Sequence, residues 1–113
     1  MNQKGDRVAI KAVFIGIDKH LNSAIPELCG ARRDATALWA LFTDTVEDLT
    51  GRLLVDEAAT HAEVIQAVLG TFAAAQNDDV IVITFAGHGS PDGNFILYDT
   101  DPAKLNTVRL TID

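Results

Sequence analysis

The chain has 113 residues and a formal net charge of -7, and 48% of its residues are hydrophobic. This length excludes a large barrel or a multidomain enzyme, and the apolar fraction excludes an intrinsically disordered chain. Because phosphate groups require a basic surface, the acidic charge argues against a nucleic acid as the main partner.

No apolar run approaches the roughly 20 residues that a membrane-spanning helix needs, so we expect no membrane partner. Residues 1–7 are polar, and we interpret them as a mobile leader rather than a signal peptide. A single domain is expected over residues 8–113. The only cysteine, Cys29, excludes an internal disulfide bond and fits a reducing compartment, so we expect a cytoplasmic protein.

The first predicted elements are a strand, a loop and a helix. Residues 8–17 are rich in Val, Ile and Phe, which predicts a buried strand. Residues 18–30 contain Asn, Ser, Pro and Gly and are predicted to form a loop. A helix is predicted over residues 31–43, because apolar residues recur there at helical spacing. Its predicted apolar face consists of Ala35, Leu38, Trp39 and Phe42.

A short strand is predicted over residues 51–55, and a second helix follows it. Thr60 and Glu63 are typical of a capping box, in which the hydroxyl accepts from the Glu63 N–H while the carboxylate reaches back. Residues 77–79, Asn-Asp-Asp, are expected to end this helix. Its predicted buried stripe consists of Val64, Ile65, Val68, Leu69 and Phe72.

The strongest predicted strand spans residues 80–86. It is continuously apolar rather than alternating, so we expect both of its faces to be buried, as in a parallel sheet between helices. A turn over residues 91–94 and another short strand over residues 95–98 complete the pattern. The order β-α-β-α-β predicts an α/β sandwich with a mainly parallel sheet.

His88 is the first candidate for chemistry, because sites in open α/β sheets form beyond the carboxyl ends of the strands. Histidine can transfer a proton near neutral pH. The flanking Gly87 and Gly89 allow backbone N–H groups to approach a substrate carbonyl. We favour a catalytic role for His88 over that of a loop histidine satisfied by a backbone partner.

Asp34, in the first turn of the first predicted helix, is the second candidate. From the residues alone, we favour a carboxylate stabilised by the helix dipole over an acid that faces a cationic substrate group. The neighbouring Arg32 and Arg33 are expected to be solvated or paired with surface carboxylates.

Other polar residues argue against a metal or cofactor site. His20 and His61 share no ligand spacing with His88 or a cysteine, which argues against zinc. Residues 99–101 offer oxygen ligands for calcium but lack EF-hand spacing, so a solvated turn is favoured. There is no phosphate-binding loop, and we expect no cofactor, although calcium activation stays open. Cys29 is interpreted as an ordinary semi-buried thiol rather than a nucleophile.

Three segments carry a family resemblance: Ala-Val-Phe-Ile-Gly-Ile-Asp at 12–18, Leu-Cys-Gly-Ala-Arg-Arg-Asp-Ala at 28–35, and Val-Ile-Thr-Phe-Ala-Gly-His-Gly at 82–89. They resemble caspase-like cysteine peptidases, especially metacaspases and related bacterial caspase homologues. Residues 95–101 are similar to the short hairpin strand and acidic end of that family. The resemblance begins near residue 8 and implies the amino-terminal, large-subunit half of a caspase-like three-layer sandwich.

The resemblance also implies roles for individual residues. His88 would be the general base and acid of a Cys-His dyad, and the Gly89 backbone N–H would help to hold the oxyanion. Asp34 would line the primary specificity pocket. Animal caspases bind aspartate through an arginine where this chain has Leu28, so the resemblance implies cleavage after Arg or Lys, which a buried carboxylate would favour. Bacterial relatives serve in regulated death or antiphage defence.

The chain departs from the family pattern in several places. Arg33 replaces the usual asparagine, and Ala31 replaces a cysteine common in metacaspases. The nucleophilic cysteine of the family lies after a further strand in an Asp-x-Cys-x-Ser-Gly-like segment, which has no counterpart here. Cys29 aligns instead with the loop before the first helix. Thr111 is suited to cap a helix that does not follow.

We therefore expect the cysteine to come from a missing segment or a partner chain. This chain alone is expected to be inactive and to expose an unpaired sheet edge. A non-catalytic caspase-like scaffold or regulator is the main alternative. A small-molecule-binding doubly wound domain is a further alternative, which the missing phosphate loop disfavours.

Overall fold

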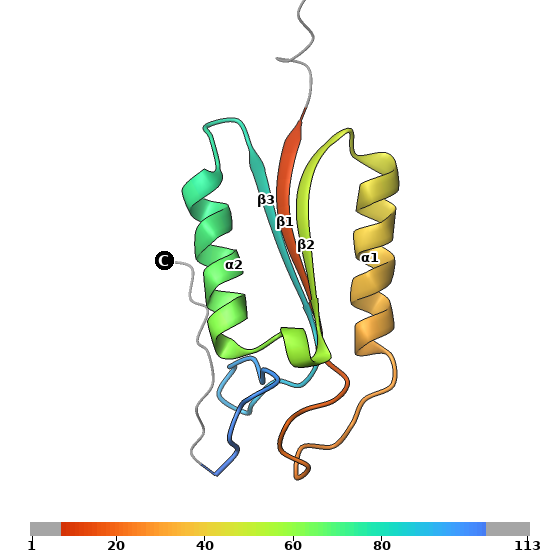
Figure 1. Ribbon diagram of the computed structural model, residues 1–113, viewed down its shortest axis with the longest axis vertical. Coiled ribbons are helices and arrows are strands. Elements are labelled where there is room, and N and C mark those ends of the chain that lie inside the picture. Colours follow the sequence, from red (N-terminus) through yellow and green to blue (C-terminus); the bar gives the residue numbers. More distant parts are fainter. Residues whose placement is uncertain (1–7, 104–113) are drawn as a thin grey trace, which may run out of the picture.

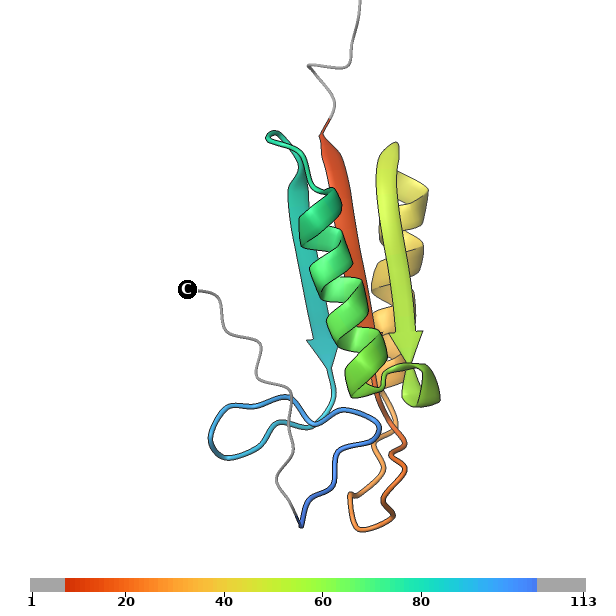
Figure 2. The same cartoon turned by 60° about the vertical axis from the view of Figure 1, so that its left-hand side comes forward.

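The computed structural model describes residues 8–103, in which a three-stranded parallel sheet lies between two α-helices (Figure 1). The elements are β1 (Ala9–Gly16), α1 (Ala31–Thr45), β2 (Asp48–Val55), the short 3-10 helix η2 (Asp56–Ala58), α2 (His61–Ala74) and β3 (Val80–Ala86). The strand order is β2-β1-β3, and β1 pairs in parallel with both neighbours. Helices α1 and α2 cover opposite faces (Figure 2), which confirms the predicted α/β sandwich.

Strand β2 is longer than predicted because it pairs with β1 along its whole length. Ala9 lies opposite Asp48 and Gly16 lies opposite Val55. The two crossovers, through α1 and α2, bring all three carboxyl ends to one edge of the sheet. The predicted leader at residues 1–7 and the predicted cap at Thr111 lie outside the described residues.

The predicted strand over residues 95–98 is wrong. This segment forms only an isolated antiparallel bridge, between Gly89 and Phe95. Its next backbone groups find other partners: Leu97 N–H donates to the Thr100 hydroxyl at 2.9 Å, and Tyr98 N–H donates to the Ala59 carbonyl at 3.0 Å. The chain therefore turns over the end of the core instead of extending along β3.

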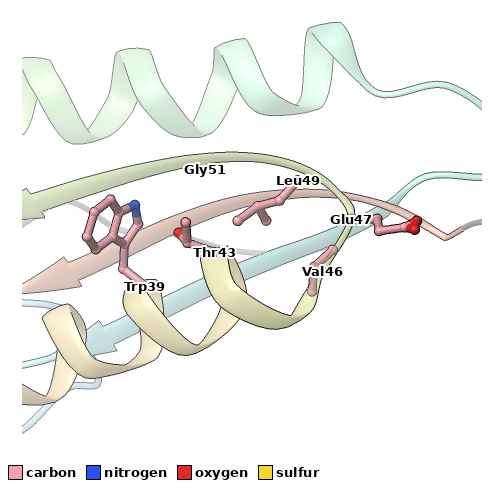
Figure 3. Close-up of a pocket in the computed structure, with 6 residues that line it drawn as sticks. All are labelled: Trp39, Thr43, Val46, Glu47, Leu49 and Gly51. Carbon is pink, nitrogen blue, oxygen red and sulfur yellow. The ribbon is translucent and has the colours of Figure 1, made fainter.

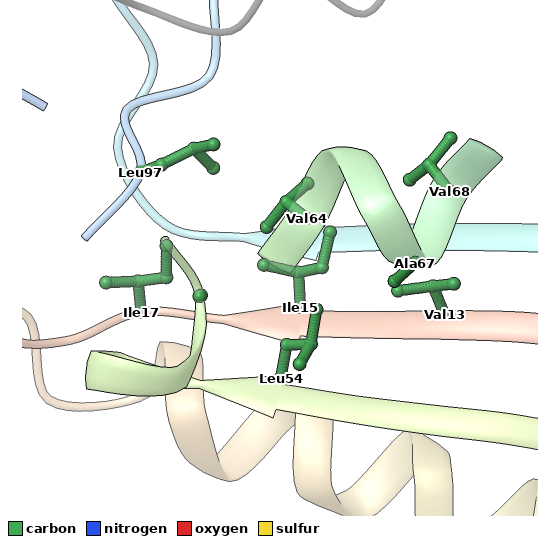
Figure 4. Packing of buried hydrophobic residues seen from close by; sticks show 9 residues of the cluster. Val13, Ile15, Ile17, Leu54, Val64, Ala67, Val68 and Leu97 are labelled. Atoms are coloured by element: carbon green, nitrogen blue, oxygen red, sulfur yellow. The ribbon is translucent and has the colours of Figure 1, made fainter. Parts of the chain in front are cut away.

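The main core lies between the sheet and α2 (Figure 4). Its buried members are Val13, Ile15, Ile17, Leu54, Ala59, Val64, Ala67, Val68 and Leu97. Most come from β1 and from the sheet-facing side of α2. Leu97, from the loop after β3, closes the core at the carboxyl edge, where the candidate site lies.

The capping box of α2 forms only in part. Thr60 is the N-cap residue, and its hydroxyl accepts a hydrogen bond from the Glu63 N–H at 3.3 Å, as predicted. The Glu63 carboxylate does not reach back but pairs with Arg52 of β2 at 3.2 Å. The start of α2 is thus tied to the sheet through this ion pair.

The predicted buried stripe of α2 is only partly correct. The buried residues of α2 are Val64, Ala67 and Val68. The exposed fractions of the other stripe residues are 41% for Ile65, 63% for Leu69 and 51% for Phe72. These three lie further round the helix, so a single contact with one sheet cannot bury both sets. An apolar strip of α2 consequently faces away from the described core.

The apolar face of α1 is also narrower than predicted. Ala31 and Ala35 are buried, whereas Leu38 is 37% exposed. Phe42 packs edge-on against Phe14 of β1, with ring centroids 5.2 Å apart. Small residues at the start of α1 allow that end of the helix to lie close to the sheet.

Strand β3 is less buried than its continuous apolar sequence predicts. Val80 is 44% exposed, and the rest of β3 is half-buried. Among the described residues, β3 has a strand neighbour only on the β1 side, so its outer flank is uncovered. None of the helices within residues 8–103 has the length and apolar character to cross a bilayer.

Candidate functional site

The candidate site lies at the carboxyl edge of the sheet, where the loops after β1 and β3 meet. His88 follows β3 closely and is half-buried. Its Nε2 atom lies 2.7 Å from the Pro26 carbonyl oxygen, in the loop between β1 and α1. Because a carbonyl oxygen can only accept, the neutral ring must carry its proton on Nε2. This tautomer leaves Nδ1 free to accept another proton.

The loop that carries Pro26 is itself held by hydrogen bonds. Leu28 N–H donates to the Asp18 carbonyl at 2.9 Å, and Ile25 N–H donates to the Asn22 carbonyl at 3.1 Å. These bonds close the loop on itself beside the end of β1. The acceptor for His88 is therefore a backbone group in a defined turn.

The backbone N–H of Gly89 points away from Phe95, its partner across the hairpin that follows β3. Two hydrogen bonds flank its bridge to Phe95: Ile96 N–H to the His88 carbonyl at 3.0 Å, and Ser90 N–H to the Asn94 carbonyl at 2.8 Å. In this antiparallel pattern the central residue's own N–H points away from its partner. A Cβ on Gly89 would meet only the Asn94 carbonyl oxygen at 3.7 Å, so space alone does not require glycine.

Asp34 lies in the first turn of α1, which begins at the same edge of the sheet. Its N–H donates to the Gly30 carbonyl at 2.9 Å, and its side chain is exposed rather than buried. Its carboxylate has no partner among the residues that the structure describes. The electrostatic argument from a buried carboxylate therefore does not apply to Asp34 in this structure.

The Arg32 side chain is largely solvated, as predicted, but the carboxylate it pairs with is buried rather than on the surface. Its Nη1 lies 3.3 Å from Oδ2 of Asp56, which is 4% exposed. Oδ1 of Asp56 accepts the N–H groups of Asp18 at 2.9 Å and Lys19 at 3.2 Å. Asp56 has φ +48°, a left-handed conformation that aspartate tolerates better than most residues. One carboxylate thus joins the ends of β1 and β2 to α1.

Asp18 fixes the start of α1 to the loop after β1. The N-cap residue Gly30 has no side chain, and Oδ1 of Asp18 accepts the Ala31 N–H at 2.8 Å instead. The sequence prediction missed Asp18 and Asp56 as organisers of this edge. The sequence feature that could have identified them is their position, since each directly follows the end of an apolar strand segment.

His20 lies beside His88, a contact that the sequence prediction also missed. The two ring centroids are 5.6 Å apart, with an interplanar angle of 46°. From the sequence, His20 is assessed only as a metal ligand, and the spacing of ligands along the chain does not show which side chains lie together in the fold. The signal lay in the topology, because β1 and β3 are parallel neighbours and each histidine closely follows one of them.

Cys29 is exposed, not semi-buried, and lies in the loop before α1. Within the described part of the chain its thiol forms no hydrogen bond with His88. The structure therefore brings the candidate histidine to the Pro26 carbonyl of this loop but not to its thiol.

The acidic segment 99–101 is a partnered turn. Oδ1 of Asp99 accepts the His61 backbone N–H at 2.9 Å and lies 2.6 Å from the His61 Nδ1. Partial burial raises the pKa of Asp99, but the hydrogen bonds from His61 outweigh it, so the net pKa is below its ordinary value. Asp101 accepts the Ala103 N–H at 3.0 Å. Residues 8–103 contain no group of three His, Cys, Asp or Glu side chains arranged to hold a metal ion.

A separate pocket opens between the end of α1 and the start of β2 (Figure 3). Its lining residues are Trp39, Thr43, Val46, Glu47, Leu49 and Gly51. Because β2 begins there, the pocket lies toward the amino edge of the sheet, opposite His88. It is not part of the candidate site.

Comparison with known proteins gives one family match. The sequence pattern of the family described as Caspase domain matches residues 9–112 of the chain. No curated protein and no solved structure is similar enough to count as a match.

Proposed function

Because the chain belongs to the caspase domain family, we propose that it supplies the histidine of a Cys-His peptidase, with His88 as general base and acid. Caspase domains are peptidases of the cysteine type, so the reaction class is peptide-bond hydrolysis. The observation that carries the proposal is the contact between His88 Nε2 and the Pro26 carbonyl. It orients the ring so that Nδ1 is the nitrogen available to a thiol.

In the proposed reaction, Nδ1 of His88 takes the proton from a cysteine thiol, and the thiolate attacks the substrate carbonyl carbon. The peptide C–N bond breaks as the protonated His88 gives its proton to the departing amine. Water then attacks the acyl-enzyme thioester, with His88 as the base, and the thiol is restored.

The backbone N–H of Gly89 is the proposed donor to the oxyanion. Its support is the geometry of the bridge to Phe95, which turns the Gly89 N–H away from the hairpin. Such preorganised donors act on the charge that develops on the carbonyl oxygen.

The nucleophile is proposed to come from a second segment or chain that docks on the free side of β3. Cys29 does not fit this role, since its thiol forms no hydrogen bond with His88 among the described residues. Val80 is 44% exposed on β3, and Phe72 is 51% exposed on the neighbouring α2. A strand added beside β3 would cover this apolar surface and satisfy the open edge.

Asp34 is the proposed recognition group for an Arg or Lys side chain before the cleaved bond. Its carboxylate is exposed at the same sheet edge as His88 and lacks a described partner. The adjacent Arg32 is paired with Asp56 and therefore competes less for that carboxylate. The exposed thiol of Cys29 also suits a reducing, cytoplasmic setting for this enzyme.

The test combines this chain with the polypeptide that its reading frame encodes beyond residue 113. The mixture is assayed on reporter peptides with Arg, Lys or Asp before an amide-linked dye. We expect cleavage after Arg and Lys that His88→Ala abolishes and that Cys29→Ser leaves unchanged. Activity that survives His88→Ala, or that disappears in Cys29→Ser, contradicts the assignment.

The same experiment separates the enzyme from a non-catalytic scaffold. If the reading frame encodes no cysteine-containing strand end, or the folded mixture cleaves none of the peptides, the scaffold function replaces the proposal. Binding without cleavage would then be measured with the same mixture by sedimentation.

A further inference from the structure

His20 is a half-buried titratable side chain that the proposed mechanism does not use. Both of its ring nitrogens are buried and have no hydrogen-bond partner among the described residues. Leaving a polar group buried without a partner costs free energy, so such groups need an explanation. The nearest polar ring is that of His88, with centroids 5.6 Å apart.

The backbone on both sides of His20 is fixed. The N–H groups of Asp18 and Lys19 donate to the buried carboxylate of Asp56. Directly after His20, Leu21 N–H donates to the Tyr98 carbonyl at 2.9 Å. These bonds reach from the loop after β1 to the end of β2 and to the segment after β3. These hydrogen bonds therefore hold the backbone of His20 so that its ring lies beside His88.

The surroundings of His20 favour its neutral form. Burial lowers its pKa below the ordinary value of 6.5, and the charge of His88 lowers it further. The Asp56 carboxylate and the backbone of Ile96 act in the opposite direction without reversing the shift. The groups that face His20 are thus His88 from the loop after β3, Asp56 from η2 and the Ile96 backbone.

We propose that His20 is a positioning residue for His88: its neutral ring holds the His88 imidazole against the Pro26 carbonyl, and its protonation weakens that arrangement. The 5.6 Å separation places two like charges close together when both rings are protonated. The inference rests on the proposed role of His88 as the base, because it assigns the residue that keeps Nδ1 directed outward.

The test uses the 113-residue chain with ¹⁵N-labelled imidazoles, whose NMR signals report the tautomer and the protonation of each ring separately. In the wild type we expect His88 to carry its proton on Nε2 at neutral pH, and His20 to titrate below 6.5. His20→Ala removes the packed ring, so His88 should populate both tautomers. His20→Phe restores a flat ring and should restore the single tautomer.

His88→Phe provides an independent measurement within an unaltered β1 loop. Because the charge of His88 lowers the pKa of His20, the midpoint of the His20 titration should rise in this variant. His61→Phe is the matched control, since His61 pairs with Asp99 at the start of α2, and it should change neither signal. Circular dichroism establishes that each variant is folded.

Two results would overturn the role of His20: the same His88 tautomer in His20→Ala as in the wild type, or an unchanged His20 midpoint in His88→Phe. The second result remains decisive if His20→Ala does not fold. None of these measurements needs the cysteine partner. A failure here is therefore distinct from a failure of peptidase activity, which the mixing experiment detects.

Discussion

The buried carboxylate of Asp56 pairs with the exposed guanidinium of Arg32 at 3.3 Å. We expect the two partners to contribute unequally to the stability of the sheet edge that carries His88. Exposed fractions of 5% for the Asp56 side chain and 60% for that of Arg32 account for the difference. Asp56 also accepts two backbone N–H groups of the loop after β1, which Arg32 does not touch.

We expect Asp56→Ala to destabilise the fold by about 2–4 kcal/mol, because it leaves two part-buried backbone N–H groups without their acceptor and removes the ion-pair partner of Arg32. Asp56→Asn keeps an acceptor oxygen and tolerates the left-handed φ, so it should cost only about 1–2 kcal/mol. Arg32→Ala should cost less than about 1 kcal/mol, because its side chain is solvated. Urea denaturation measures all three, and equal losses in Asp56→Ala and Arg32→Ala would contradict this order.

Gly16, at the end of β1, is required by the close approach of α1. A Cβ there would lie 2.5 Å from the Ala31 carbonyl oxygen and 2.6 Å from the Ala35 Cβ, so the helix would have to move. We expect Gly16→Ala to reduce the free energy of unfolding by about 3 kcal/mol. Thermal denaturation followed by circular dichroism measures this loss.

Gly70→Ala is the matched control for that change. Gly70 lies within α2, and a Cβ at this position would meet no atom within 4 Å, so alanine fits freely there. Alanine favours a helix over glycine by about 1 kcal/mol, so this variant should be more stable than the wild type. If both alanine variants behaved alike, the contact at Gly16 would not be the cause.

The order of elements and their sheet could be predicted because the strand segments are short apolar runs, whereas the helix segments have apolar residues at helical spacing. The run at 80–86 and the cap at Thr60 located β3 and the start of α2 closely. Which side chains become buried was less predictable, because it depends on partners: Leu69 is apolar at helical spacing and yet 63% exposed. The helical spacing of apolar residues does not show how wide a face of the helix the neighbouring sheet covers.

The candidate site was predictable only where one residue carries the signal. His88 stands out between two glycines after a strand, whereas His20 and Asp56 depend on which strands are neighbours. Since β1 lies between β2 and β3, their loops converge although they are far apart in sequence. The contact between His88 and the Pro26 carbonyl could not be predicted, because every residue has a backbone carbonyl and the sequence does not show which one a histidine contacts.

Asp34 gives a prediction about substrate choice in the reconstituted peptidase. Asp34→Asn removes the proposed charge-assisted contact with Arg or Lys, so kcat/KM for those peptides should fall about tenfold or more. Asp44→Asn is the matched control, because Asp44 is an exposed carboxylate at the other end of α1. Steady-state kinetics measures kcat/KM for both variants. If kcat/KM fell equally in Asp34→Asn and Asp44→Asn, the cause would be the change in net charge and not a contact with Asp34.

The pairing of Asp99 with His61 predicts how stability changes with pH. Hydrogen bonds from His61 place the pKa of Asp99 below its ordinary value of 3.8 in the folded chain. Because the folded-state pKa is the lower one, this stabilisation is complete above the ordinary value and disappears as the pH falls through the folded value.

Asp99→Asn should therefore destabilise the chain by about 1 kcal/mol at neutral pH, a modest amount because the carboxylate is partly solvated. The difference between wild type and variant should shrink toward zero in strong acid, where both side chains are uncharged. Urea denaturation across this pH range measures it. Asp101→Asn, in the same turn, keeps an acceptor for the Ala103 N–H and should show little pH dependence of its own. A constant difference between Asp99→Asn and the wild type at all pH values would mean that the charge of Asp99 does not stabilise the start of α2.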